Sequence, residues 1–395
     1  MASSLAELRG LADTAGAMVI AEFSQVLSSY HPGSLIGEGK IEEIASALQT
    51  KKAGTVIFDM ELSAAQQKTL EKVLKAKIID RTRLILDIFA KRARTSEGRL
   101  QVELAQLSYM LPRLTGAWRS YSQQVGGIGT RGPGERKLEY ERRHIQYRIL
   151  HLKKELERVK SSRDIRRQKR LSVPMPQVAL IGYTNVGKST LLNALTQSAS
   201  VYADDKLFAT LDPTARRVRL PEGSWAVVTD TVGFIQRLPT QLVAAFGSTL
   251  EEVKLADCLL LISDATAKNS ENQYKAVETI LAQLGAQDIP RVRVFNKIDL
   301  LTSPQRRDLE GRCPQELFIS AATGEGVTQA LKSVQNLLST RWMLREIDLP
   351  TWALKQGALI YGCAQVLSQK HMGDKTRYRL RLTPENWDRL RKKLF

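Results

Sequence analysis

Cysteine and histidine are scarce in this chain of 395 residues. Its three cysteines, Cys258, Cys313 and Cys363, are far apart in the sequence. That spacing matches none of the usual cysteine-rich metal sites, and it suits a reducing compartment and a chain without a disulfide framework. The four histidines are scattered at positions 31, 144, 151 and 371, which argues against a transition-metal site.

Long apolar runs are also missing. No run approaches the roughly 20 residues that a membrane-spanning helix needs. The N-terminus does not have the pattern of a signal peptide, because Ser4 and Glu7 ahead of Leu8 and Leu11 predict a capping box on an ordinary helix. We therefore expect a soluble cytoplasmic protein, and the length suggests two to four domains.

Positive charge is in excess, with a net charge of +18, and it is unevenly distributed. Residues 131–170 contain 15 basic and 6 acidic side chains and residues 341–395 contain 12 and 5, whereas residues 171–340 contain 16 and 17. This pattern favours nucleic-acid binding over a solvated basic helix face. The first segment is rich in arginine, whose guanidinium group matches phosphate: Arg131, Arg136, Arg142, Arg143, Arg148, Arg158, Arg163, Arg166, Arg167 and Arg170.

The chain is organised around residues 182–189, GYTNVGKS, which lie between the apolar run 178–181 and a helical pattern at 190–195. This is G-x-x-x-x-G-K-[ST] in the strand–loop–helix context of a phosphate-binding loop. Lys188 is expected to reach the terminal phosphates, and Ser189 to offer its hydroxyl to Mg²⁺. A plain glycine turn is the alternative, and the motifs downstream decide against it.

Three further motifs follow apolar strand patterns in the order expected of a GTPase. Asp230-Thr231-Val232-Gly233 can hold Mg²⁺ through water and follow a γ-phosphate. In Asn296-Lys297-Ile298-Asp299, the Asp299 carboxylate can accept two hydrogen bonds that guanine offers and adenine does not; a site built around such a buried acceptor rejects the wrong ligand by roughly 10⁴ to 10⁵. Ser320-Ala321-Ala322 completes the set near the guanine carbonyl.

The first 95 residues alternate helix and strand patterns. We expect helices at 4–15, 40–48 and from the cap Ser63 to about Lys75, and an amphipathic helix through Leu84, Ile88 and Phe89. Strands are expected at 18–23, 55–58 and 76–79, which together give a small α/β layer with parallel strands. Gly37-Glu38-Gly39-Lys40 lacks the spacing of a phosphate loop and favours a helix-entry turn.

Two matching apolar stripes come next, stepping by four and three residues. They predict two helices that pack as an antiparallel hairpin, with a second arm over about 135–170 whose outward faces carry the arginines. The connection 115–134 has five glycines within 126–134. It favours either contact with irregular RNA or a mobile linker. The stripes are Leu100, Leu104, Leu107, Leu111 and Leu114, then Ile145, Ile149, Leu152, Leu156 and Val159.

Together these patterns predict an α/β multidomain fold. The expected domains are a small α/β layer (1–95), a helical hairpin with a glycine-rich tip (96–172), a P-loop GTPase domain (173–340) and an α+β tail (341–395). Residues 204–214 are the expected switch region, and 215–220 should pair with 225–230 as an antiparallel edge of a parallel sheet. In the tail we expect strands near 358–367 and 378–382, then a helix opened by Thr383-Pro384.

Several of these motifs resemble those of the HflX family of ribosome-associated GTPases, and the likeness covers nearly the whole chain. Besides the P-loop and the two motifs at Asp230 and Asn296, they include Asp80-Arg81-Thr82 with 84–90, 101–107, the glycine loop and 207–214. Two departures stand out: Glu135 is followed by Arg136-Lys137 where the family usually has Thr-Gln, and no strand precedes the first helix.

The resemblance implies a factor that uses GTP and Mg²⁺, binds the large ribosomal subunit and its RNA near the peptidyl-transferase centre, and separates stalled or idle ribosomes into subunits.

Residue chemistry leaves Thr210 and Thr214 open as the switch threonine on Mg²⁺, and the resemblance implies Thr210. We expect catalysis to rest on Lys188, Thr210, Asp230 and Gly233, and Mg²⁺ to bind Ser189 and Thr210. The expected GTP-binding residues are Gly182, Tyr183, Thr184, Asn185, Val186, Gly187, Lys188, Ser189, Thr190, Phe208, Ala209, Thr210, Leu211, Asp212, Asp230, Thr231, Val232, Gly233, Asn296, Lys297, Ile298, Asp299, Ser320, Ala321 and Ala322. The expected RNA contacts are Arg119, Gly126, Gly127, Gly129, Thr130, Arg131, Arg136, Lys137, Arg142 and Arg143.

Two other functions use the same features: a ribosome-assembly or RNA-remodelling GTPase, and a regulatory switch whose hairpin recruits proteins. We also expect slow intrinsic turnover, because Phe234 stands where many GTPases place a water-orienting glutamine. A ribosome would supply the missing element. Away from the ribosome, we expect a monomer.

Overall fold

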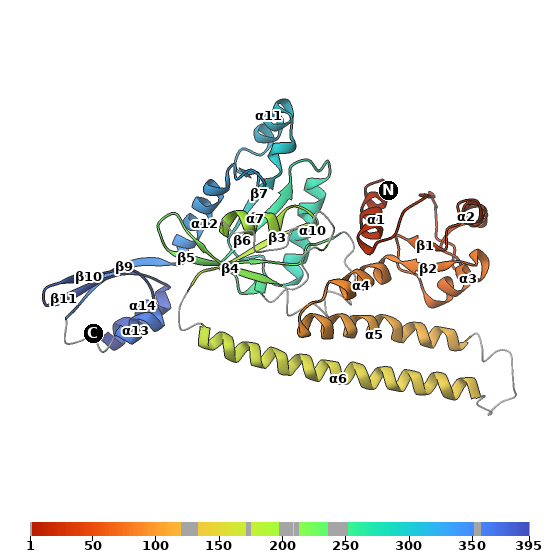
Figure 1. The fold of residues 1–395 in the computed structure, drawn as a ribbon, viewed down its shortest axis with the longest axis horizontal. Helices are drawn as coiled ribbons and strands as arrows, with labels where there is room; N and C mark the ends of the chain where they lie inside the picture. The colour runs from red at the N-terminus through yellow and green to blue at the C-terminus, as the bar shows by residue number, and fades with distance from the viewer. Residues whose placement is uncertain are drawn as a thin grey trace. The chain divides into compact units, whose positions relative to one another are not determined.

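The computed structural model describes residues 2–119, 133–170, 175–196, 208, 213–235, 252–350 and 357–394. The chain forms two compact units (Figure 1). One comprises Met1–Val159 with Lys206–Phe208 and Arg237–Phe246, and the other comprises Lys160–Asp205, Ala209–Gln236 and Gly247–Phe395. The division into four domains remains a prediction.

The first unit begins with four helices and a two-stranded parallel sheet. The helices are α1 (Ala2–Ala15), α2 (Glu38–Thr50), α3 (Ala64–Leu74) and α4 (Arg81–Arg92), and the strands are β1 (Thr55–Phe58) and β2 (Lys77–Asp80). Local sequence explains the starts of two of the helices. Gly37 is the N-cap of α2, and Ser63 with Gln66 forms a capping box on α3. The helix-entry turn predicted at Gly37 is therefore confirmed.

Two predictions for the N-terminal stretch were wrong. No strand forms over 18–23: the described sheet of this unit contains only β1 and β2, and Met18 is left 85% exposed. The expected capping box at Ser4 and Glu7 is also absent, because both residues lie inside α1. Ser4 donates to Asp59, and Glu7 forms an ion pair with the buried Arg81. The need to neutralise a buried guanidinium outweighs the local capping signal.

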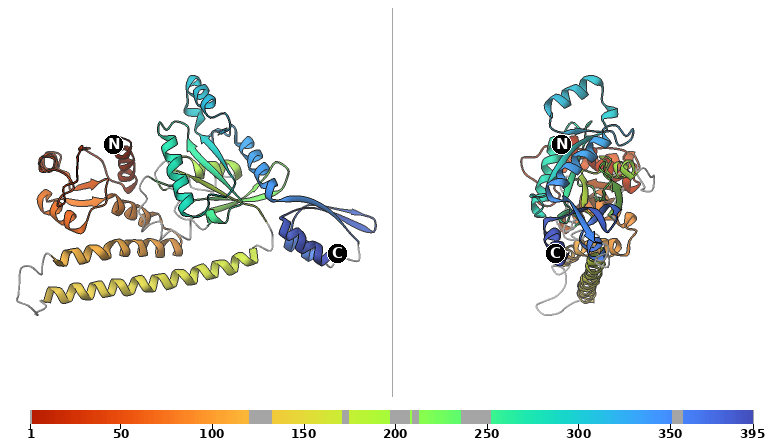
Figure 2. Two further views of the ribbon diagram at one scale, coloured as in Figure 1. Left: turned by 180° about the vertical axis from the view of Figure 1, so that it is seen from behind. Right: turned by 90° about the vertical axis from the view of Figure 1, so that its left-hand side faces the viewer.

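The helical hairpin is formed by α5 (Ser96–Arg119) and α6 (Pro133–Arg170), which lie side by side in both long views (Figures 1 and 2). The stripe predicted on α6 is the least exposed face of that helix, with Leu152 fully buried. On α5 the stripe is only half-buried, because the opposite face, with Val102, Ala105 and Tyr109, is buried and α5 also packs against α3 and α4.

Two details of the hairpin differ from the prediction. Both helices extend into the expected loop 115–134, to Arg119 and from Pro133, so the connection is shorter. Arg148 does not belong to the outward face. Its guanidinium donates two hydrogen bonds to Glu103 of α5, at 2.7 and 2.9 Å, because a bidentate pair with a carboxylate is available across the hairpin.

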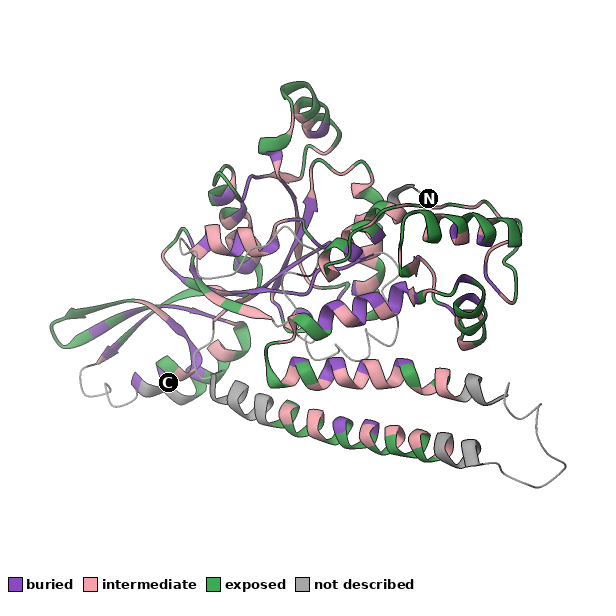
Figure 3. Cartoon of the chain, turned by 45° about the vertical axis from the view of Figure 1, so that its right-hand side comes forward, coloured by how far each residue is buried: buried purple, intermediate pink, exposed green. Residues whose placement is uncertain are grey.

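The second unit is built on a six-stranded sheet in the order β4-β5-β3-β6-β7-β8. Figure 3 shows buried residues concentrated along these strands. As predicted, β4 and β5 form an antiparallel edge on a parallel sheet. The strands are β3 (Gln177–Gly182), β4 (Thr214–Arg219), β5 (Trp225–Asp230), β6 (Cys258–Asp264), β7 (Arg291–Asn296) and β8 (Leu317–Phe318). The helices are α7 (Lys188–Thr196), α10 (Ser270–Gln283), η1 (Ile298–Leu300), α11 (Ser303–Arg312) and α12 (Val327–Arg341).

The chain ends in a three-stranded antiparallel sheet, β10-β11-β9, with two helices. The elements are β9 (Met343–Pro350), α13 (Gly357–Cys363), β10 (Gln365–Met372), β11 (Lys375–Leu382) and α14 (Pro384–Leu394). The strand expected near 358–367 was wrong over its first half, which is α13, and β9 was missed. In α13, Ile360 is fully buried and Cys363 nearly so, both in a core with Leu380 and Leu390, so tertiary packing decided the helix.

Candidate nucleotide-binding site

The loop between β3 and α7 requires glycine at its two signature positions. A Cβ on Gly182 would lie 2.2 Å from the carbonyl oxygen of Ile262 in β6. Gly187 has φ +90°, and a Cβ there would lie 2.3 Å from Nδ2 of Asn296. The loop therefore passes so close to its neighbours that only glycine fits, which holds its backbone N–H groups at the end of β3.

Lys188 is buried at the start of α7, with an exposed fraction of 7%. Its Nζ donates hydrogen bonds to the carbonyl oxygens of Tyr183 at 2.7 Å and Gly182 at 3.2 Å. Burial lowers the pKa of Lys188 to about 8, and the nearby Asp230 carboxylate partly opposes this. A phosphate group would supply the anionic partner that this buried ammonium group calls for.

Ser189 and Asp230 bring together the oxygens expected at a magnesium site. Ser189 Oγ donates to Asp230 Oδ2 at 2.7 Å, and Asp230 is fully buried at the end of β5. No three His, Cys, Asp or Glu residues in the described part of the chain form a metal-binding group. A hydroxyl and a carboxylate still fit Mg²⁺, which takes few protein ligands and completes its shell with phosphate oxygens and water.

Gly233 and Phe234 are tied to the phosphate loop. A Cβ on Gly233 would lie 2.8 Å from Thr184 and 3.0 Å from Nζ of Lys188. Phe234 is 2% exposed, its N–H donates to the carbonyl of Gly182 and its own carbonyl accepts from the N–H of Thr184. The position after Gly233 is thus a buried phenyl ring, which has no group that could orient a water molecule.

Asn296 links the phosphate loop to the segment that follows β8. Its Nδ2 donates to the carbonyl of Val186 in the phosphate loop at 2.8 Å, and its Oδ1 accepts from the N–H of Ala321 at 2.9 Å. The next residue, Lys297, takes a left-handed backbone conformation with φ 68° and pairs with Asp264 at 2.8 Å. Asp264 was not predicted from the sequence, although it ends β6 at the same edge of the sheet as Asn296 ends β7.

Asp299 is exposed on η1, whereas the sequence led us to expect a buried acceptor. Its neighbour Ile298 is buried and anchors the turn, and Ser320 is fully buried. The carboxylate of Asp299 is therefore presented to the solvent in the protein alone, and a bound base itself would have to bury it.

The expected switch residues Ala209, Thr210, Leu211 and Asp212 lie outside the described residues, and Thr214 is the first residue of β4. Phe208 is described. It is 2% exposed, has φ 57°, and its ring packs edge-on against Phe89 of α4 with 4.6 Å between the ring centroids. No local pattern in the sequence signals this contact.

Most of the expected RNA contacts also lie outside the described residues. Gly126, Gly127, Gly129, Thr130 and Arg131 do, and so do the side chains of Arg119, Arg136 and Lys137. Arg142 and Arg143 are described and exposed on α6, where Arg143 also pairs with Glu139 at 2.6 Å. None of the helices that the structure describes is long and apolar enough to cross a membrane.

Three family profiles match consecutive parts of the chain. They are described as GTP-binding GTPase N-terminal (residues 2–90), GTP-binding GTPase Middle Region (92–170) and 50S ribosome-binding GTPase (177–297). The second covers the hairpin, and the third covers the nucleotide site from β3 to Lys297.

Similar proteins named GTPase HflX come from several bacteria. The protein from Caldanaerobacter subterraneus subsp. tengcongensis is 51% identical over 338 residues, which is 85% of this chain and 77% of the relative. That of Escherichia coli is 44% identical over 88% of this chain and 82% of its own length. That of Lacrimispora saccharolytica is 48% identical, with 94% and 87% covered.

Among solved structures, a GTP-binding protein from the archaeon Sulfolobus solfataricus in complex with GDP is 24% identical, with a TM-score of 0.45 over 85% of this chain and 95% of that one. A structure of Era in complex with MgGDPNP and nucleotides 1506–1542 of 16S ribosomal RNA is 22% identical, with a TM-score of 0.35 over 42% and 57%.

Proposed function

The chain belongs to the HflX family of GTPases and is a GTP hydrolase, and on that premise we propose that it binds the large ribosomal subunit and separates ribosomes into subunits. The observation that carries this proposal is the joining of a neutral GTPase domain to a strongly basic helical hairpin. Residues 131–170 have 15 basic and 6 acidic side chains, while residues 171–340 are nearly balanced. Such a distribution favours contact with an RNA surface.

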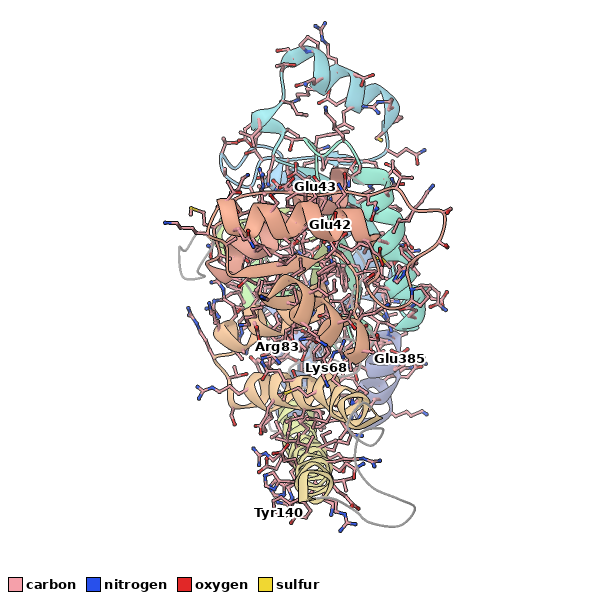
Figure 4. The ribbon with its side chains drawn as sticks, turned by 90° about the vertical axis from the view of Figure 1, so that its right-hand side faces the viewer. Glu42, Glu43, Lys68, Arg83, Tyr140 and Glu385 are labelled. Atoms are coloured by element: carbon pink, nitrogen blue, oxygen red, sulfur yellow. The ribbon has the colours of Figure 1, made fainter. Side chains whose placement is uncertain are left out.

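The described part of α6 supports contact with RNA. Arg142, Arg143 and Arg158 are exposed along it. Tyr140 is 72% exposed, lies on the same helix (Figure 4), and its ring is stacked with that of His144 at a centroid distance of 6.5 Å. Exposed aromatic rings close to guanidinium groups are typical of surfaces that stack bases and hold phosphates. The glycine-rich segment 126–134 is proposed as the part that approaches irregular RNA.

We assign the GTPase chemistry to the residues gathered at the phosphate loop. Lys188 binds the terminal phosphates, Gly233 brings its N–H to the γ-phosphate, and Asp299 selects guanine. Ser189 and Thr210, with Asp230 through water, would hold Mg²⁺, which would neutralise phosphate charge when bound. Because Phe234 cannot orient the attacking water, intrinsic hydrolysis should be slow and should accelerate when a ribosome supplies the missing element. Fast turnover of the purified protein, unchanged by ribosomes, would contradict this.

Light scattering of intact ribosomes tests the splitting function. With a non-hydrolysable GTP analogue, we expect the native protein to lower the scattering as subunits separate, and GDP to give little change. The double variant Arg142→Glu, Arg143→Glu should split poorly. Lys51→Glu, Lys52→Glu changes an equally adjacent, exposed basic pair of the same unit and serves as the control.

Sedimentation separates the alternatives. A ribosome-assembly factor would bind free large subunits and leave intact ribosomes whole under every nucleotide. A regulatory switch that recruits proteins would bind neither particle, and its interactions would depend little on salt, whereas phosphate contacts make binding steeply salt-dependent. Failure to dissociate ribosomes with any nucleotide would rule out the splitting function.

A further inference from the structure

An open groove of about 280 Å³ lies in the second unit, away from the phosphate loop in sequence. Its lining comes from β4 and β5 of the large sheet, from the segment before β3 and from the end of the chain: Met175, Arg217, Trp225, Tyr361 and Gln365. Most of its lining surface is apolar. None of these residues belongs to a nucleotide-binding motif, so GTP binding does not explain the groove.

Two aromatic side chains of the groove are left unusually open to solvent. Trp225 is 45% exposed and Tyr361 is 49% exposed. Trp225 is the first residue of β5 and lies directly opposite Arg219 of β4. Large aromatic rings stabilise a fold chiefly when they are buried, so two half-exposed rings in one groove are typical of a surface that a ligand covers.

The floor of the groove contains an amide with unused hydrogen-bonding capacity. Gln365 is 7% exposed, and its Nε2 donates to the carbonyl oxygen of Trp225 at 3.2 Å. Its Oε1 has no hydrogen-bond partner among the residues that the structure describes. A buried acceptor without a donor is costly, and the edge of a nucleobase offers donors.

The charge around the groove favours a polyanion. Arg217 lines it, and Arg219 is exposed two residues further along β4. Other arginines here are engaged within the protein: Arg381 is buried against Glu222 and Ser224, and Arg377 pairs with Asp348 at 2.8 Å.

We propose that this groove is a second RNA-binding site, which takes one unpaired nucleotide with its base on Trp225 and Tyr361 and its phosphates on Arg217 and Arg219. Stacking on aromatic rings with arginines beside them is the usual way in which proteins hold single-stranded RNA. The inference extends the proposed ribosome binding to a second contact. Its test uses a short oligonucleotide, so it succeeds or fails independently of ribosome splitting.

The test is titration of the full chain with hexauridylate while tryptophan fluorescence is recorded. We expect quenching that saturates in the native protein and is largely lost in Trp225→Phe, which keeps an aromatic ring in β5 and therefore the fold. In fluorescence anisotropy with labelled hexauridylate, Tyr361→Ala should weaken binding about tenfold. Arg217→Ala should also lower the slope of log Kd against log salt by about one.

Tyr30→Ala, which removes a ring that is 61% exposed in the other unit, is the matched control and should bind as the native chain does. Equal quenching in Trp225→Phe and the native protein would overturn the proposal. So would equal affinity of Tyr361→Ala and Tyr30→Ala, since RNA held only by the basic hairpin gives that result. If hexauridylate leaves the groove unaffected, a protein segment becomes the better candidate occupant.

Discussion

The phosphate loop and helix α6 both rely on basic side chains, but they hold them in opposite ways. Lys188 is buried, bonded to two backbone carbonyls and surrounded by glycines that no other residue could replace. Arg142 and Arg143 are exposed and only loosely engaged. A buried charge makes a site selective because any change leaves a polar group unsatisfied. An exposed row of charges gives affinity that adds up over many weak, salt-sensitive contacts.

The largest effect should follow from Asp299→Ala, which tests how selective the nucleotide site is for guanine. Removing the carboxylate leaves guanine without its acceptor, so the preference for GTP over ATP should fall by about 10³ to 10⁵. Competition of both nucleotides against a fluorescent GDP analogue measures the ratio. Asp308→Ala, on the exposed helix α11, is the control and should leave the ratio unchanged.

Gly233→Ala should reduce GTP hydrolysis by about 10² or more. The new Cβ would have to lie 2.8 Å from Thr184 and 3.0 Å from Nζ of Lys188, so the backbone at the γ-phosphate position must shift. Phosphate release in single-turnover conditions is the measurement. Gly311→Ala has open space around its Cβ and should turn over GTP normally; equal rates for the two variants would show that this close approach does not matter for hydrolysis.

On helix α6, the double variant Arg142→Ala, Arg143→Ala should weaken binding to the large subunit by about tenfold at physiological salt. Each lost phosphate contact should lower the salt slope by about one. Arg148→Ala provides the comparison within the same helix, because its guanidinium is engaged by Glu103. The salt slope of Arg148→Ala should match that of the native protein. A decrease in slope as large as that of the double variant would mean that it does not matter which face of α6 an arginine occupies.

The smallest effect concerns pH. Burial sets the pKa of Lys188 at about 8 in the protein alone, and a bound phosphate should raise it. Nucleotide then binds the protonated form better, so affinity is retained below about pH 8 and declines as the pH rises past that value. Between pH 7 and pH 8.8 we expect GDP affinity to fall by about 5- to 10-fold. Affinity that is flat over this range would show that the pKa of Lys188 is not depressed.

Local signals in the sequence predicted the elements whose geometry depends on neighbouring residues. The capping box at Ser63, the antiparallel pair β4–β5 and the P-loop between β3 and α7 were all confirmed, because each is specified by a few adjacent side chains or by one turn. The same local signals failed at Ser4 and over 358–363. There a buried arginine and a hydrophobic core, formed by residues distant in sequence, decided the outcome.

The candidate site shows the same division. Its residue types and their order along the chain identified a GTPase, because phosphate, Mg²⁺ and guanine each demand particular groups at strand ends. The hydrogen bonds of Asn296 to Val186 and Ala321, which tie those groups together, could not be foreseen. Neither could the packing of Phe208 on Phe89, since nothing in the neighbourhood of either residue marks the other as a partner.

The sequence by itself thus determined the chemistry of this protein: which groups can face phosphate and guanine, and where positive charge accumulates. Only the tertiary structure decided which charges are available. It turned Arg148 inward to Glu103 and buried Arg381 against Glu222, while it left Arg142 and Arg217 open. The physical reason is that the availability of a charge depends on its neighbours in space, and those come from distant parts of the chain.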